Sequence, residues 1–285
     1  YYYIMNGHDL NNNQIASLNK IQFQTLSNSD IRNLSVINDS KYGITQTEVS
    51  GNAKNTILDP RLGTTDSHRV CDKCNQDINR CPGHFGHTEL AVPIFNYAFI
   101  ELVRVILGCI CLNCSKILIT KKNQDEIMNI VRTKKGHTRL VHMKNIFKSV
   151  KRCQRPDVEC GNLVPMIKKA IKGSFGLIAE YMDEQHDGEE ERVTKGKKKV
   201  ENLDAKKVYG ILRIISDEDM LMLGFNPEIC RIENFIMKVY PIPPLAIRPS
   251  VRTSITSSSN FEDTLISQIQ YMVKTNNDIR KELDR

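Results

Sequence analysis

The stretch "CDKCNQDINRCPGHFGH", residues 71–87, holds three cysteines and two histidines. Within it Cys71 and Cys74 form a CxxC pair, and Cys81 and His84 form a second pair with the same two-residue gap. Structural zinc is bound tetrahedrally by four sulfur or imidazole ligands, and two short chelating turns brought face to face supply such a set. The stretch therefore predicts a structural zinc site around which this part of the chain folds.

The fourth ligand of this site has two candidates, because His87 follows closely after His84. We prefer His84, since its CxxH gap repeats the geometry of the CxxC pair, and we expect His87 to pack beside the site. Pro82 and Gly83 suit the tight turn within the second pair, because proline presets φ and glycine accepts a positive φ.

A second set of cysteines follows further along the chain. Cys111 and Cys114 form another CxxC pair, and their natural partners are Cys153 and Cys160, which six residues separate. The long connection between the two pairs adds little to the entropy of closing the site, because that entropy grows only with the logarithm of length. We therefore expect a second structural zinc, held by four cysteines.

The cysteine count and the chain's opening favour metal ligation over disulfides. Nine cysteines is an odd number, and most occur as close pairs, a pattern typical of metal sites in a reducing compartment. Cys109 and Cys230 remain, and we expect both to pack as small apolar side chains. The chain opens on "YYYIMNGHDLNNNQ", which lacks the basic and apolar regions of a secretory signal, so we expect an intracellular home.

Composition excludes several other classes of protein. The chain of 285 residues is 40% hydrophobic and 26% charged, as expected of a globular protein able to bury a core. No uninterrupted apolar run approaches the ~18 residues of a membrane-spanning helix. The formal net charge of +7 favours a polyanionic partner.

Apolar periodicity and capping signals predict the following elements. We expect a short helix in "NSDIRNLSVI", capped by Ser27 or Ser29 and reaching Val36, and two helices on either side of Gly136 within residues 125–150. Further expected elements are a buried-face helix over residues 94–107 with Phe95, Phe99, Leu102, Val103 and Ile106, a solvated charged loop over residues 181–200, and a helix followed by a Ser216-capped helical turn that Gly224 and Pro227 close. The last two are a strand over residues 234–240 with Phe235, Met237 and Val239 alternating, and a long helix over residues 260–283 with Leu265, Ile269, Met272, Ile279 and Leu283 on one face.

No motif of a catalytic site accompanies these elements. The HExxH, GxSxG and GxxxxGK[ST] patterns are absent from the sequence. Both predicted zinc sites have four protein ligands and leave no position for a reacting water. Asp217, Glu218 and Asp219 stand at an expected helix N-terminus, where carboxylates act as caps and as complements to the helix dipole.

Eight strings occur in order along this sequence: "DPRLGTTD" (59–66), "CDKC" (71–74), "CPGHFGH" (81–87), "PIFNYAFI" (93–100), "CICLNCSKIL" (109–118), "ECGN" (159–162), "ISDEDMLMLGFNPE" (215–228) and "YPIPPLAIRPSV" (240–251). Together they resemble the N-terminal part of the largest subunit of multisubunit DNA-directed RNA polymerases. "CPGHFGH" is similar to the polymerase II and archaeal type, whereas "PPLAIRPSV" and the compact region between Cys160 and Lys206 are more similar to the subunits of large nucleocytoplasmic DNA viruses.

The resemblance implies that this region is the clamp, a mobile wall beside the cleft that holds DNA and the RNA/DNA hybrid. The implied fold is α+β, with several helices, small antiparallel sheets and irregular loops around two zinc sites, and the family's zinc ligands match the same eight residues. The implied parts are an N-terminal extended segment over residues 1–58, a first zinc-binding part of the clamp core over 59–115, a clamp head with the second zinc site and a charged insertion over 116–205, and the clamp core return with a proline-rich connector and a C-terminal helix over 206–285.

The resemblance also implies partners and a cofactor outside this chain. The catalytic Mg²⁺ of the family is held by an aspartate-rich loop that this sequence lacks, and the chain begins with Tyr1, so we expect a fragment of a longer subunit. Expected partners are DNA, the RNA/DNA hybrid, the second-largest and smaller subunits, and initiation and elongation factors, with no membrane. The expected location is the nucleus for a cellular protein, or the host cytoplasm and virion for a viral one.

Basic residues near the second zinc site are candidate nucleic-acid contacts through phosphates, with solvated surface as the alternative. Charge reversal at Lys168 and Lys169 is expected to lower the salt resistance of the open complex. The candidates are Lys144, Lys148, Lys151, Arg152, Arg155, Lys168, Lys169 and Lys172.

Two alternatives to the clamp interpretation remain, a free-standing zinc module that docks to nucleic acid or protein, and a metalloenzyme with an open zinc position. The "YPIPP" run is interpreted as a rigid internal connector, with a polyproline ligand for a partner domain as the alternative.

Overall fold

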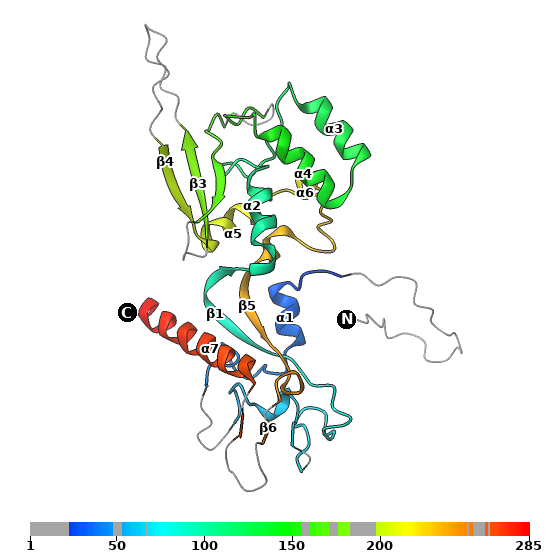
Figure 1. Cartoon of the computed structure of the whole chain (residues 1–285), viewed down its shortest axis with the longest axis vertical. Coiled ribbons are helices and arrows are strands. Elements are labelled where there is room, and N and C mark those ends of the chain that lie inside the picture. The colour runs from blue at the N-terminus through cyan, green and yellow to red at the C-terminus, as the bar shows by residue number, and fades with distance from the viewer. Residues whose placement is uncertain are drawn as a thin grey trace, which may run out of the picture.

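The structure is a computed structural model that describes residues 23–47, 53–66, 68–155, 160–170, 176–182, 198–249, 251–252, 260–261 and 263–285. Within these residues the chain forms seven α-helices and three small antiparallel sheets (Figure 1). The fold is therefore α+β, as predicted. None of the described helices is both long and apolar enough to cross a membrane.

A two-stranded ribbon occupies the middle of the molecule (Figure 1). Strand β1 (Gly86–Phe95) pairs antiparallel with β5 (Ile236–Ile242), from Gly86 opposite Ile242 to Phe95 opposite Ile236. The register shifts between Glu89 and Ile94. Because β1 begins two residues after His84, the ribbon leads directly out of the first cysteine-rich stretch.

The larger hydrophobic core lies on one side of this ribbon and is enclosed by helices and a three-stranded sheet. Phe147 and Ile106 are among its fully buried side chains. The elements are α2 (Ile100–Leu107), α3 (Gln124–Thr133), α4 (Gly136–Phe147), β2 (Met166–Lys169), β3 (Leu177–Met182), β4 (Lys198–Leu203), α5 (Ala205–Ile214) and α6 (Asp217–Leu223).

A smaller core lies on the other side of the ribbon, and includes Ile44, Leu62 and Ile242. The long helix α7 crosses this half of the molecule (Figure 1), and its Asn276 hydrogen-bonds the backbone of β1 at Glu89 O and Ala91 N, both over 2.8 Å. The elements of this half are α1 (Asn28–Leu34), β6 (Val251–Arg252), β7 (Asn260–Phe261) and α7 (Thr264–Leu283). The 3₁₀ turns of the described residues are η1 (Pro60–Leu62), η2 (Tyr97–Phe99), η3 (Ile232–Phe235) and η4 (Leu245–Ile247).

Several predicted helix boundaries are confirmed. Ser27 caps α1 and forms a reciprocal capping box with Asp30, a pairing that satisfies two backbone donors at the helix start. Gly136, at φ +53°, is the first residue of α4, shortly after α3 ends at Thr133. Ser216 accepts a hydrogen bond from the Asp219 amide at the start of α6, and Gly224 ends that helix at φ +98°.

The predicted helix over residues 94–107 is wrong in its first part. Ile94 and Phe95 belong to β1, where they pair with Met237 and Ile236, and α2 begins only at Ile100. Backbone pairing with β5 overrides the helical spacing of these apolar side chains, because local pattern is weaker than tertiary context.

The predicted buried face of the C-terminal helix is wrong by part of a turn. Helix α7 buries Ile266, Ile269, Val273 and Asn276, whereas Leu283 is 62% exposed. The buried face includes a polar residue, Asn276, which hydrogen-bonds β1. A prediction that follows only apolar residues therefore selects a different face of the helix. Ile269 alone is shared by both sets, while Leu265 and Met272 are half-buried and Ile279 is exposed.

Two smaller predictions are also corrected. Strand β5 buries Ile236, Val239 and Ile242 in place of strict alternation, as expected of a two-stranded ribbon, which twists more strongly than a wide sheet. The predicted loop over residues 181–200 is wrong at both ends, because Tyr181 pairs with Lys199 between β3 and β4. Residues 183–197 lie outside the described part of the chain, as do residues 1–22 of the predicted extended segment.

Candidate metal centres

The first cysteine-rich stretch brings its four candidate ligands together. One ligand atom from each of Cys71, Cys74, Cys81 and His84 lies within 4.8 Å of all the others, and Cys81 Sγ is 3.8 Å from His84 Nε2. We call these four residues the first centre. The spacing in the sequence therefore corresponds to proximity in space.

Backbone hydrogen bonds shape the CxxC turn of the first centre. The Cys71 amide donates to Gln76 O over 3.0 Å, and Asn75, at φ +55°, donates its amide to Cys71 O over 2.8 Å. The Lys73 amide points at Cys71 Sγ over 3.4 Å. Amides directed at sulfur favour the thiolate, which is the form that binds metal.

Gly83 fixes the other turn of the first centre. It lies at φ +77°, and a Cβ at this position would be 2.6 Å from Pro244 Cβ. Its amide points at Cys81 Sγ over 3.4 Å, and the next amide, of His84, donates to Leu62 O over 3.1 Å. The turn is thus held between the "DPRLG" and "YPIPPL" segments, which lie far apart in the sequence.

A second group has the same construction. The ligand atoms of Cys111, Cys114, Cys153 and Cys160, which we call the second centre, lie within 4.8 Å of one another. The Cys111 amide donates to Lys116 O over 2.9 Å. Ser115, at φ +56°, donates its amide to Cys111 O over 2.9 Å, so both CxxC turns share one backbone geometry.

The wide gap between Cys153 and Cys160 is closed by backbone pairing. The Cys153 amide donates to Asn162 O over 2.8 Å, and the Val164 amide donates to Lys151 O over 2.9 Å. The chain therefore leaves and returns along an antiparallel pair, which places both sulfurs at its end. Residues 156–159 lie outside the described part of the chain.

The geometry of both centres fits tetrahedral zinc. With Zn–S bonds of about 2.3 Å, two sulfurs on one zinc lie about 3.8 Å apart. The Cys111–Cys160 and Cys114–Cys153 sulfur separations are 3.7 and 3.8 Å, whereas a disulfide would need about 2.0 Å. All nine cysteines are free thiols. Each donor set has four members, as in structural zinc sites.

The ligands differ in protonation preference, and in the absence of a cation burial opposes the thiolate form of some of them. Burial raises the pKa of the Cys153 thiol and raises that of Cys81 to about 11. The Asn162 amide, with other donors, lowers the pKa of Cys160 to about 6. Burial lowers the pKa of His84, which keeps its imidazole neutral and able to ligate.

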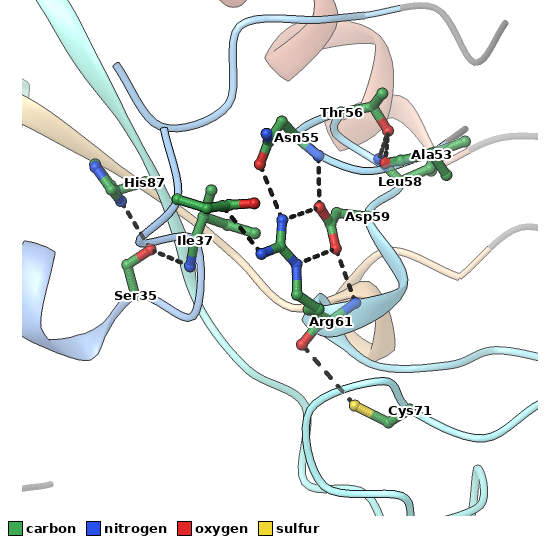
Figure 2. Close-up of polar contacts among 11 residues, drawn as sticks. Ser35, Ile37, Ala53, Asn55, Thr56, Leu58, Asp59, Arg61, Cys71 and His87 are labelled. Carbon is green, nitrogen blue, oxygen red and sulfur yellow. Dashed lines mark hydrogen bonds and ion pairs between the residues drawn. The ribbon is translucent and has the colours of Figure 1, made fainter. Parts of the chain in front are cut away.

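A charged network that sequence reasoning missed lies beside Cys71 of the first centre (Figure 2). Arg61 donates to both oxygens of Asp59, over 3.0 and 2.8 Å, and to Asn55 Oδ1 over 2.9 Å. Its carbonyl oxygen lies 3.9 Å from Cys71 Sγ. Asp59 is fully buried; burial would raise the pKa of its carboxyl, but the donors from Arg61 and Asn55 outweigh burial and lower it. One feature of the sequence could have indicated a structural role for Asp59. It directly precedes Pro60, as an N-cap residue often does, and it is the N-cap of η1.

His87, Cys109 and Cys230 lie outside the two centres and are packed within the fold. His87 is buried, and its Nδ1 lies 2.7 Å from Ser35 Oγ (Figure 2), so it is a packing residue outside the group of four ligands. Cys109 is fully buried, and burial raises the pKa of its thiol to about 12. Cys230 is half-buried and packs against the larger core.

Six of the predicted nucleic-acid residues line one groove with a volume of about 1770 Å³, bounded by α2, α4 and β2. Their positions are Lys144, Lys148, Lys151, Arg152, Lys168 and Lys169. Lys172 lies outside the described part of the chain. Arg155 does not line the groove, and its Nη1 lies 3.0 Å from the fully buried carboxylate of Asp219.

Charges in this groove are unequal. Of the residues that the structure describes, eight cations line it, adding Arg104 and Lys122 to the six named above, against three carboxylates. Lys168 is ion-paired with the carboxylate of Glu180, and Lys169 lies 3.0 Å from that of Glu101. These pairs reduce the positive charge on the β2 side, so Lys148 at the end of α4 is the less compensated position.

The comparison with protein families agrees with this arrangement. Residues 15–285 match the family model described as RNA polymerase Rpb1, domain 1. The chain belongs to this family. Both centres of this Rpb1 domain 1 chain lie within the matched residues.

Two relatives of this chain are named as subunits of DNA-directed RNA polymerases. The chain is 34% identical over 274 residues to DNA-directed RNA polymerase subunit 1 of Acanthamoeba polyphaga mimivirus, with 93% of this chain and 18% of the relative covered. It is 34% identical over 274 residues to DNA-directed RNA polymerase II subunit RPB1 of Euplotoides octocarinatus, with 93% of this chain and 54% of the relative covered. This Rpb1 domain 1 chain thus spans about a fifth and about half of these two relatives.

Proposed function

We propose that this chain is the clamp portion of the largest subunit of a DNA-dependent RNA polymerase, a non-catalytic wall that closes over DNA and the RNA/DNA hybrid. The observation that carries the proposal is the family match over residues 15–285, which contains two complete four-ligand centres. A wall that swings as a unit must be internally stiff, and metal cross-links supply stiffness where the cores are small.

The first centre would hold one structural Zn²⁺ with three sulfurs and one nitrogen, and the second would hold another with four sulfurs. Bound zinc supplies a rigid cross-link there and no chemistry. Structural zinc contributes folding free energy on the order of 10 kcal/mol. The parts proposed for residues 1–58, 59–115, 116–205 and 206–285 follow from the same clamp interpretation.

The metal content of single variants tests the two centres separately. Native mass spectrometry of the chain is expected to give two zinc ions, and Cys74→Ser or Cys114→Ser is expected to remove one each. Cys230→Ser is the matched control, because its half-buried thiol lies outside both centres, and it should keep two. A count of one zinc in the unaltered chain would contradict the proposal.

We also propose that the groove beside the second centre contacts nucleic-acid phosphates. Lys148 is exposed and lines this groove, and phosphate contacts position nucleic acid without reading its sequence. In the assembled polymerase, Lys148→Glu is expected to lower the salt resistance of the open complex and to reduce the salt slope of DNA binding by about 1.

The control for this experiment is Lys134→Glu, because Lys134 is exposed at the end of α3 and does not line the groove. An equal salt slope for both variants and the unaltered enzyme would refute the contact. Lys168→Glu with Lys169→Glu is expected to have a smaller effect, since Glu180 and Glu101 already compensate these lysines.

The remaining parts of the proposal concern the whole subunit. The catalytic Mg²⁺ is held by residues outside this chain, and the activity is nucleotidyl transfer by the full enzyme. The clamp works with the second-largest and smaller subunits and with initiation and elongation factors. Its location is intracellular, in the nucleus for a cellular enzyme or in the host cytoplasm and virion for a viral one.

A further inference from the structure

Arg248 is buried without a counter-ion. Its side chain is 1% exposed, and its Nε and Nη2 donate to the carbonyl oxygens of Pro243 and Ile57. Its Nη1 has no hydrogen-bond partner. A guanidinium presents five N–H donors and is always charged, so two neutral carbonyls leave both its charge and one of its edges uncompensated.

No carboxylate of the described residues compensates this charge. Every other buried Asp, Glu, Lys or Arg side chain among those residues has an ionic partner: Asp59 pairs with Arg61, Asp219 with Arg155 and Glu180 with Lys168. Arg248 forms no ion pair in the described part of the chain. Burial is the sole cause that lowers its pKa, to about 10. Buried charges in proteins are normally paired or bound to an ion.

A cavity of about 630 Å³ lies beside Arg248. Its wall combines apolar side chains, such as Leu58 and Ile266, with Gly63 and Thr64 and with two carboxylates, Asp66 and Asp72. Asp66 lies 3.9 Å from the guanidinium of Arg69, which also lines the cavity. The space is large enough for a small oxyanion and its hydration. Nη1 itself is covered in this structure, so contact with an anion in the cavity requires a local movement of the cavity wall.

We propose that Arg248 forms the base of a small oxyanion site, in which a carboxylate or phosphate group bonds Nη1 from the cavity. The anion completes the guanidinium's hydrogen bonds and neutralises its charge. A hydrogen bond with charge on both partners is roughly twice as strong as a neutral one. The site joins the "IRPS" segment to the first centre, a role distinct from zinc binding and from the groove beside the second centre.

The test follows Arg248 directly by NMR of the chain with ¹⁵N-labelled arginine. Sodium phosphate and sodium acetate are added separately, with ionic strength held constant by sodium chloride. The Arg248 Nε–H resonance is assigned by its loss in Arg248→Met. We expect this resonance to shift and saturate with at least one anion, with phosphate alone indicating a tetrahedral ligand, acetate alone a carboxylate, and both a general oxyanion site.

A matched control lies at the same cavity. Arg69 also lines it, but its side chain is 81% exposed, and Arg69→Met should leave the Arg248 response unchanged. A second measurement compares unfolding midpoints: the anion should raise that of the unaltered chain and of Arg69→Met, and not that of Arg248→Met. No saturable shift of Arg248 with either anion would overturn the proposal, and that result needs only the unaltered chain. Zinc content is measured throughout, because loss of zinc would change the midpoint independently.

Discussion

Individual residues position the first centre in two ways, through backbone conformation and through charge. Gly83 is required by a positive φ and by the approach of Pro244, whereas Asp59 acts through charge, by fixing Arg61 beside Cys71. The CxxC and CxxH gaps predicted which four residues meet, because chelating spacing is local. The Asp59–Arg61 network was not predictable, since its value depends on burial that a linear pattern does not contain.

Replacing Asp59 with asparagine is expected to destabilise the chain by about 3 kcal/mol at pH 7, because it leaves Arg61 without its buried partner. The folded-state pKa of Asp59 lies below its unfolded value. Its stabilisation is therefore complete above about pH 4 and is lost as the pH falls through the folded-state pKa.

Urea unfolding across pH measures this difference between the unaltered chain and Asp59→Asn. The two free energies of unfolding should converge as the pH falls below 4. The control is Asp72→Asn, at an exposed neighbour of the same centre. A constant difference between Asp59→Asn and the unaltered chain down to acid unfolding would contradict the ionised pair.

Secondary-structure elements were predictable where the signal is local. Ser27, Gly136 and Gly224 act through their own backbone or side chain, and each marks a boundary that the structure has. The strand conformation of Phe95 and the buried face of α7 were not predictable from local sequence. They depend on contacts with β5 and β1, which lie far away in the sequence. The paired ends of β3 and β4 were hidden for a related reason, since charged residues can form strands when a partner strand lies beside them.

Helix α7 offers a test at this scale. Asn276→Ala is expected to cost about 1–3 kcal/mol, because it leaves the Ala91 amide and the Glu89 carbonyl without their partner. Chemical unfolding measures the change. Lys274→Ala, at an exposed position of the same helix, should be close to neutral. If Asn276→Ala were equally neutral, the contact between α7 and β1 would not contribute to stability.

At the scale of the whole molecule, the described residues form two cores joined by the β1–β5 ribbon, and each core has one candidate metal centre beside it. Cys111 and Cys153 belong to the larger core, and the His84 amide bonds Leu62 of the smaller core. We therefore infer that each of the two proposed zinc ions would stabilise mainly its own half. The family match gives these two halves a place in a polymerase subunit.

Hydrogen exchange tests this division. Cys74→Ser should increase amide exchange mainly around Ile44 and Leu62, whereas Cys114→Ser should increase it mainly in α2 and α4. Comparison with Cys230→Ser corrects for effects of losing any thiol. Equal loosening of both halves by either variant would show that the two cores unfold as one unit.

The most direct test of the two structural zinc centres is X-ray absorption at the zinc edge on the purified chain. Seven sulfurs and one nitrogen shared by two ions predict an average of about 3.5 sulfurs at ~2.3 Å and about 0.5 nitrogen at ~2.0 Å per zinc. That average, with two zinc ions per chain, is the expected result. A spectrum with a bound water oxygen, or with fewer than three sulfurs per zinc, would contradict two closed structural centres.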